Sequence, residues 1–206
     1  MQTDLVETAM PIAERKITAA DIVPAAQFAA QRRARRAALL PAKRLRRIAL
    51  GPWCTVYFES FETMLFQIQE MLLIEKGGDE QLADELAAYN PMIPQGAELT
   101  CTLMFEIDDP DRRARVLAEL GGVEDHFFLE IDGARADAVQ EGDIERTRED
   151  GKTSSVHFLH FPLTGAQVAD FRAPGARVLI GCDHPKYAHM AMISEESRAE
   201  LAKDLA

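Results

Sequence analysis

A predicted helix in the first half of this 206-residue chain is apolar on nearly every side. Ser60 can cap its start, and Gly77-Gly78 ends it. With successive residues 100° apart, one broad face carries Phe61, Met64, Leu65, Ile68, Met71 and Leu72. Phe66 and Leu73 fall on the opposite side, where a surface helix would be polar. The pattern therefore predicts a central helix that is covered from two sides.

The same helix carries Gln67, Gln69 and Glu70 among its apolar residues. Buried polar groups need hydrogen-bonding partners, so these residues indicate either a site or an internal polar lock. Of the carboxylates around the helix (Glu59, Glu62 and Glu70), Glu62 and Glu70 lie about 12 Å apart along the helix axis, too far to share a proton or a metal. Two interpretations of Glu70 stay open. It is a buried acid with a shifted pKa, or it pairs with an arginine, which the sequence favours.

A second helix is expected after the glycine turn, and it breaks at Asn90-Pro91 because a residue before proline avoids the helical conformation. This helical hairpin would return Tyr89 and Asn90 to the start of the central helix. His184 precedes Pro185 at the end of a predicted strand, where loops often carry functional residues. The candidate polar site comprises Gln67, Glu70, Tyr89, Asn90 and His184.

The charges are distributed unevenly. Residues 1–50 hold ten Lys and Arg against four Asp and Glu, a balance of +6, and the rest of the chain holds 13 against 30, a balance of −17. The candidate basic surface comprises Arg32, Arg33, Arg35, Arg36, Arg44, Arg46 and Arg47. Such a cluster suits an acidic partner or nucleic acid, or it docks on the chain's own carboxylates. The acidic remainder would repel nucleic acid, and no aromatic residues interleave with the arginines to stack bases, so the sequence disfavours nucleic-acid binding.

Length and turn signals define the organisation. We expect a flexible N-terminus over residues 1–16 and a single α+β domain over 17–206, with a subdivision near 94–97 left open. Pro41 is predicted to end or kink a helix, and Asp132-Gly133 predicts a hairpin. The fold class is therefore α+β, with N-terminal helices and a central buried helical hairpin packed on a largely antiparallel sheet.

Several enzyme classes are excluded by their motifs. Gly151-Lys152-Thr153 resembles the end of a P-loop, but Arg146 stands where that motif needs glycine. The chain contains no G-x-G-x-x-G after a strand and no G-x-S-x-G. None of its histidines follows a glutamate by three residues, as a di-iron bundle would require. We therefore expect neither a metal nor a cofactor.

Three further expectations concern single residues and location. Cys54, Cys101 and Cys182 form no close pair, so we expect three buried thiols. His157 and His160 lie three apart on a predicted strand and should point to opposite faces. An acidic N-terminus and the lack of a ~20-residue apolar run predict a cytoplasmic protein with no membrane span.

Four segments carry a family resemblance. They are Phe66-Gln67-Ile68-Gln69-Glu70-Met71, Ala88-Tyr89-Asn90-Pro91-Met92-Ile93-Pro94, Arg148-Glu149-Asp150 leading into Phe158-Leu159-His160-Phe161-Pro162-Leu163, and Asp183-His184-Pro185-Lys186-Tyr187. Together, over about residue 17 to the C-terminus, the chain resembles an uncharacterised bacterial domain-of-unknown-function family. Members are often encoded beside a rubrerythrin-like protein and an iron–sulfur oxidoreductase, so the resemblance implies a role near redox or peroxide metabolism by association.

Three functional hypotheses follow. The favoured one is a non-catalytic accessory protein of a bacterial redox or peroxide-response system. It would bind the iron–sulfur oxidoreductase or the rubrerythrin-like protein through the arginines or the loop near His184. The second is a small-ligand-binding protein or an enzyme with Gln67, Glu70, Asn90 and His184 in one pocket. The third is a nucleic-acid binder through residues 32–47.

Overall fold

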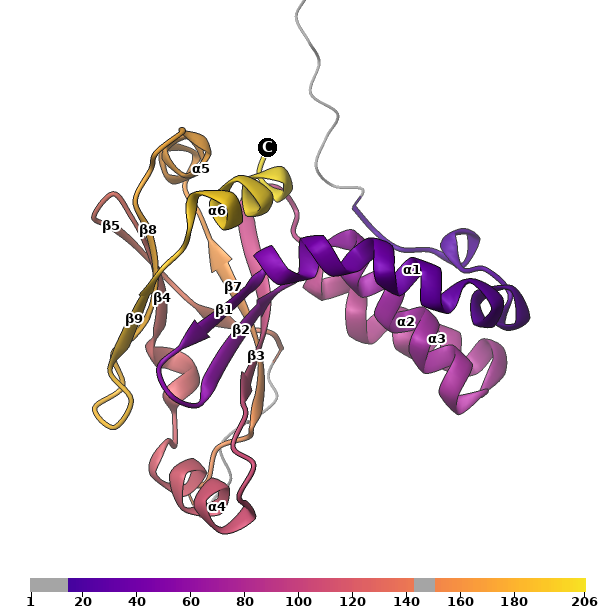
Figure 1. The fold of residues 1–206 in the computed structure, drawn as a ribbon, viewed down its shortest axis with the longest axis horizontal. Coiled ribbons are helices and arrows are strands. Elements are labelled where there is room, and N and C mark those ends of the chain that lie inside the picture. The colour runs from indigo at the N-terminus through magenta and orange to yellow at the C-terminus, as the bar shows by residue number, and fades with distance from the viewer. Residues whose placement is uncertain (1–14, 143–150) are drawn as a thin grey trace, which may run out of the picture.

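The computed structural model describes residues 15–142 and 151–206. In this part of the chain the strands form two antiparallel sheets, one in the order β1-β2-β3-β7-β6 and the other in the order β5-β4-β8-β9. Both sheets contribute side chains to one apolar core, so they pack face to face as a sandwich (Figure 1). The predicted α+β class is confirmed.

The strands are β1 (Arg47–Leu50), β2 (Cys54–Phe58), β3 (Glu98–Phe105), β4 (Phe127–Ile131), β5 (Ala134–Asp137), β6 (Val139–Gln140), β7 (Val156–Pro162), β8 (Val178–Cys182) and β9 (His189–Met192). The helices are α1 (Ala25–Leu45), α2 (Phe61–Glu75), α3 (Gly78–Tyr89), α4 (Pro110–Glu119), α5 (Gly165–Arg172) and α6 (Glu195–Leu201). Short 3₁₀ turns are η2 (Ala19–Asp21), η3 (Asn90–Met92), η4 (Val123–His126) and η5 (Ala202–Asp204).

Strand β7 shows how alternation builds the core. Leu159 and Phe161 are fully buried between the sheets together with His157, whereas His160 lies on the other face. There the two ring nitrogens of His160 lie 2.9 Å from Glu98 Oε2 and 2.6 Å from Glu141 Oε2. The prediction that His157 and His160 point to opposite faces is confirmed.

Helices α1, α2 and α3 form an arm that projects from the sandwich, with α2 between the other two (Figure 1). On one side of α2, Met64 and Ile68 belong to a second apolar cluster, which Ile17 joins from the N-terminal segment. On another side, Phe66 meets Phe28 of α1 edge-on, with 5.6 Å between ring centroids. The prediction of a helix covered from two sides is confirmed.

The helical hairpin meets the sheet near the base of the arm. Phe158 of β7 packs against the apolar cluster of the arm, and beyond that point α2 and α3 extend away from the sandwich (Figure 1). Strands β1 and β2 come between α1 and α2 in the sequence, so the chain passes from arm to sandwich and back.

A buried ion network joins the arm to the C-terminus. Arg46, directly after α1, is 4% exposed, and its guanidinium lies 3.1 Å from Glu200 Oε1 and 2.6 Å from Asp204 Oδ2. It also donates to the main-chain oxygens of Glu59 (3.0 Å) and Glu200. Assigning Arg46 to the basic surface was therefore wrong, because the chain's own C-terminal carboxylates bind it.

The sequence predicts a flexible N-terminus over residues 1–16. Residues 1–14 lie outside the described ranges, so only residues 15 and 16 of this segment are described. Arg15 donates hydrogen bonds to the main-chain oxygens of Pro94 and Asp204. In the described ranges, no helix combines the length and the apolar character that crossing a bilayer requires.

Candidate functional site

Glu70 is bound by an arginine. Both carboxylate oxygens accept hydrogen bonds from Arg32 of α1, at 2.7 Å from Nε and 2.5 Å from Nη2. The favoured interpretation, that Glu70 pairs with an arginine, is confirmed. Its carboxylate is therefore not free to bind a ligand. Asn90 is also engaged, because its side-chain amide accepts the N–H of Ile17 at 2.8 Å and donates to its carbonyl at 3.0 Å.

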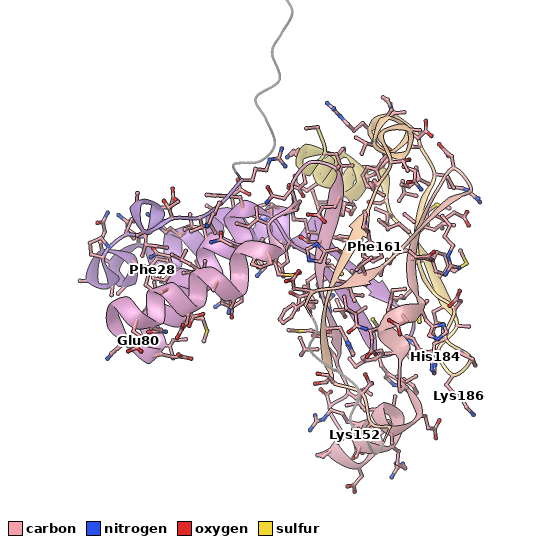
Figure 2. The ribbon with its side chains drawn as sticks, turned by 180° about the vertical axis from the view of Figure 1, so that it is seen from behind. Phe28, Glu80, Lys152, Phe161, His184 and Lys186 are labelled. Carbon is pink, nitrogen blue, oxygen red and sulfur yellow. The ribbon has the colours of Figure 1, made fainter. Side chains whose placement is uncertain are left out.

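His184 lies in a different part of the molecule. Figure 2 shows Phe28 and Glu80 on the arm and His184 at the far side of the sandwich. Its ring is buried, and its Nδ1 accepts the backbone N–H of Lys186. Asp183 does not orient it, because this carboxylate binds His126 at 2.8 Å and Arg135 at 2.9 Å. The single pocket expected from Gln67, Glu70, Asn90 and His184 is therefore not formed.

The remaining arginines of the basic segment divide into two groups. Arg47 contacts Tyr57 and Glu106, and Arg35 donates to Gln31 within α1. Within the described ranges, no salt bridge or hydrogen bond involves the exposed side chains of Arg33, Arg36 and Arg44. The basic surface is thus narrower than the sequence predicts, because four of its seven arginines have partners within the chain.

A cavity of about 340 Å³ lies where the base of the arm meets the outer face of the five-stranded sheet. Its apolar walls include Met64, Met104, Val156 and Phe158. Polar groups reach it from Lys43, Tyr57, Glu59, Gln67 and Tyr89, among others. The structure therefore brings two predicted site residues, Gln67 and Tyr89, into one cavity together with Glu59.

Glu59 occupies the junction between β2 and α2. Its backbone N–H donates to the carbonyl of Thr100, which continues the pairing of β2 with β3 past the strand end. The hydroxyl of Thr102, on β3, donates to Oε1 at 2.7 Å, and the hydroxyl of Thr63, in the first turn of α2, donates to Oε2 at 2.6 Å. Both carboxylate oxygens are thus held by the scaffold.

The electrostatics of Glu59 are unusual. The residue is only 9% exposed, and burial raises the pKa of its carboxyl. Hydrogen bonds from Thr63 and Thr102, and the positive charges of Lys43 and Arg46, oppose that rise in pKa without cancelling it. A buried acid with a raised pKa in a cavity is a frequent mark of a functional site.

Three polar side chains of the cavity remain available to a ligand. In the described part of the chain, Lys43, Gln67 and Tyr89 form no side-chain hydrogen bond and no salt bridge, although all three line the cavity. Arg46 also lines it, but its guanidinium is taken by Glu200 and Asp204. The free groups are therefore one ammonium, one amide and one phenol around an apolar interior.

We expect Glu59→Gln to raise the free energy of unfolding at pH 7. Because burial raises the pKa of Glu59 in the folded state, the folded protein binds the proton more tightly than the unfolded chain. The carboxyl therefore stabilises the fold most below its unfolded pKa of 4.5, and this stabilisation is lost as the pH rises through the raised pKa. Urea titrations at pH 5 and pH 7 measure the effect, which should be larger at pH 7.

The exposed neighbour Glu62 supplies the matched control, and Glu62→Gln should leave this pH dependence unchanged. An unchanged pH dependence in Glu59→Gln would contradict the raised pKa.

The three cysteines are buried free thiols, as predicted. Burial raises the pKa of Cys182 to about 11 and raises the pKa of Cys54 and Cys101 as well. Little thiolate is then present at neutral pH, so these side chains are poorly suited to peroxide chemistry. In the described ranges, no three or more His, Cys, Asp or Glu side chains are grouped so that they could hold a metal ion.

Native protein at pH 7 should therefore react very slowly with Ellman's reagent. All three cysteines should react at once in guanidinium chloride, because unfolding removes the burial that raises their pKa values. Absorbance at the wavelength of the released thiolate gives the count in both states. Rapid labelling of even one cysteine in the native state would contradict the buried assignment.

The arrangement defines an α+β protein with a ligand-sized cavity of unassigned chemistry. The chain belongs to a family described as proteins of unknown function (DUF3501), whose model matches residues 16–205. It is similar to a novel protein of unknown function from Burkholderia pseudomallei K96243, known from a crystal structure at 1.90 Å resolution. The two share 38% sequence identity and a TM-score of 0.86 over 93% of this chain and 100% of that one. No curated protein matches the chain.

Proposed function

We propose that this protein is a non-catalytic binding protein that holds a small, largely apolar molecule in the Glu59 cavity. The observation that carries the proposal is a set of polar groups, Lys43, Gln67 and Tyr89, that have no hydrogen-bond or salt-bridge partner in the described ranges and surround an apolar interior. A binding role is favoured over catalysis because the cavity acid with the raised pKa, Glu59, has both oxygens held by the scaffold. Each of these oxygens already accepts a hydrogen bond from a threonine hydroxyl, that of Thr63 or Thr102.

Filling the cavity tests this proposal. Val156→Phe adds a ring at the wall, on the outer face of β7, without touching the hydrogen bonds of Glu59. Val139→Phe adds the same ring at a position on β6 that is 55% exposed and outside the cavity. With 2-naphthol as the probe in ligand-observed NMR, the wild type and Val139→Phe should bind and Val156→Phe should not. Equal binding by all three proteins would refute the cavity as the site.

A second candidate function, binding of a protein partner, is favoured by the outward face of α1. Arg33, Arg36, Leu40 and Arg44 follow one another at spacings of three and four residues, so they lie on one face of the helix. Leu40 is 43% exposed between the arginines. A face of three arginines, unpaired among the residues that the structure describes, around an exposed leucine suits an acidic protein surface with an apolar centre. We propose the iron–sulfur oxidoreductase or the rubrerythrin-like protein as the partner, which would make the chain an accessory protein of a redox system in the cytoplasm.

Charge reversal tests the partner. Arg33→Glu/Arg36→Glu should abolish co-purification with the iron–sulfur oxidoreductase and with the rubrerythrin-like protein. Arg112→Glu/Arg115→Glu on α4 places the same charge change on another exposed helix and should leave co-purification intact. Failure of the wild-type protein to bind either candidate, in oxidised and in reduced form, would remove the redox link. Steeply salt-dependent binding of DNA, lost in the α1 variant alone, would instead support the nucleic-acid hypothesis.

A further inference from the structure

The charged side chains that line the Glu59 cavity differ in whether they already have a partner. The cavity is lined by three ionisable groups whose charge a ligand could meet directly: Lys43, Arg46 and Glu59. The guanidinium of Arg46 is neutralised by two carboxylates at 2.6 and 3.1 Å. In the described part of the chain, Lys43 alone among these groups has neither a salt bridge nor a hydrogen bond.

The carboxyl of Glu59 is bound by hydroxyl groups of the scaffold. Each of its oxygens accepts a hydroxyl hydrogen, from Thr102 at 2.7 Å and from Thr63 at 2.6 Å. These donors compensate part of the charge, and burial, which raises the pKa of the carboxyl, favours its neutral form. Both oxygens of Glu59 are thus held by the scaffold, and the charged group of the cavity that has no hydrogen bond or salt bridge in the described part of the chain is the ammonium of Lys43.

The walls indicate the rest of the ligand. Met64 on α2, Met104 on β3 and Val156 on β7 are apolar, and the two methionines can adapt to different shapes. Gln67 and Tyr89 add an amide and a phenol that can hydrogen-bond to a carboxylate or to a ring substituent. A single ammonium balances one negative charge, so a monoanion fits better than a doubly charged phosphate, whose second charge would meet no unpaired cation in the described lining.

We propose that the cavity selects a small organic carboxylate with an apolar body, whose acid group binds the ammonium of Lys43. This inference rests on the proposed function, because it names the ligand class of the same cavity. It assigns to Lys43 the role of the specificity-determining residue and to Met64, Met104 and Val156 the role of the apolar wall. A cation or a neutral molecule of the same shape would lack the charged contact and would bind more weakly.

A matched pair of probes tests the inference. 2-Naphthoate and 2-naphthamide have nearly the same shape and differ in charge, and isothermal titration calorimetry measures the affinity of each. The wild type should bind the carboxylate about tenfold more tightly than the amide, as expected for a hydrogen bond to a charged group. In Lys43→Met this preference should disappear, while the affinity for the amide stays within about twofold of the wild-type value.

Two further variants locate the effect. Arg44→Met removes a charge from the next residue of α1, outside the cavity lining, and should keep the preference. Val156→Phe should block both probes. Equal affinities for the two probes in the wild type, or an equal loss of preference in Lys43→Met and Arg44→Met, would overturn the assignment of Lys43 while leaving the cavity as a binding site. Binding of neither probe to the wild type would instead refute the proposed function itself.

Discussion

Replacing Arg46 by methionine should lower the free energy of unfolding by about 3–5 kcal/mol. Arg46 is 4% exposed, and its guanidinium forms salt bridges with Glu200 and Asp204, which are also buried. Methionine fills much of the same space but leaves Asp204 without its salt bridge to Arg46 and leaves Glu200 with only the exposed ammonium of Lys203. It also removes the hydrogen bond from Arg46 to the main-chain carbonyl of Glu59, a residue that lines the cavity. Urea denaturation followed by circular dichroism measures the loss.

Arg47 is the control for this prediction, since it is the next residue and is exposed. Its salt bridge with Glu106 is 3.4 Å long and joins two side chains that are 51% and 44% exposed. Arg47→Met should therefore cost no more than about 1 kcal/mol. The triple variant Arg46→Met/Glu200→Gln/Asp204→Asn removes the stranded charges and should recover part of the stability. Equal losses in Arg46→Met and Arg47→Met would show that the buried network contributes nothing special.

The local elements of the fold are written in short stretches of sequence. Asp132-Gly133 forms the predicted hairpin between β4 and β5, with φ values of 47° and 90° that suit aspartate and glycine. The two-sided apolar pattern of α2 is likewise local, and the structure confirms it. Pro41 shows the limit of such rules, because α1 continues through it to Leu45.

The arrangement of those elements depends on contacts that are distant in sequence. The predicted antiparallel sheet is two sheets, because β7 returns to β3 while β8 pairs with β4. The sequence of a single strand does not determine which other strand it pairs with. The end of α1 is tied to the C-terminal segment by a contact of the same kind, because Arg46 pairs with Glu200 and Asp204, more than 150 residues later.

The residues of the candidate site also differ in whether their contacts are local or distant in sequence. Gln67 and Tyr89 could be found because the helical hairpin brings them together over a short stretch of chain. Glu59 was not among the predicted site residues, because one of its two hydroxyl partners, Thr102, lies 43 residues away on another strand. The one local signal was Thr63, four residues after Glu59 at the start of a helix. The sequence wrongly grouped His184 with Gln67 and Glu70. A histidine before a proline indicates a turn, but it does not indicate which other element the side chain will contact.

Replacing Tyr187 by phenylalanine should lower the free energy of unfolding by about 3 kcal/mol. The side chain is 1% exposed, and its hydroxyl bridges main-chain groups at the turn between β1 and β2. It donates to the carbonyl of Leu50 at 2.7 Å and accepts the N–H groups of Trp53 and Cys54 at 3.1 and 2.9 Å. Phenylalanine keeps the ring contacts, such as the edge-on contact with Phe105, and removes the phenol from the buried main-chain groups of Leu50 and Cys54 and from the half-buried N–H of Trp53.

The exposed phenol of Tyr57 provides the comparison for this loss. Tyr57→Phe removes hydrogen bonds to Arg47 and Glu106 that water can replace, so its cost should stay below about 1 kcal/mol. Hydrogen exchange adds a local measurement, because the amides of Trp53 and Cys54 should lose protection in Tyr187→Phe but not in Tyr57→Phe. The turn also needs Gly51, whose φ is +68° and where a Cβ atom would lie 2.5 Å from the ring of His189. Unchanged protection of both amides in Tyr187→Phe would mean that Gly51 and the strand pairing hold this turn without the hydroxyl.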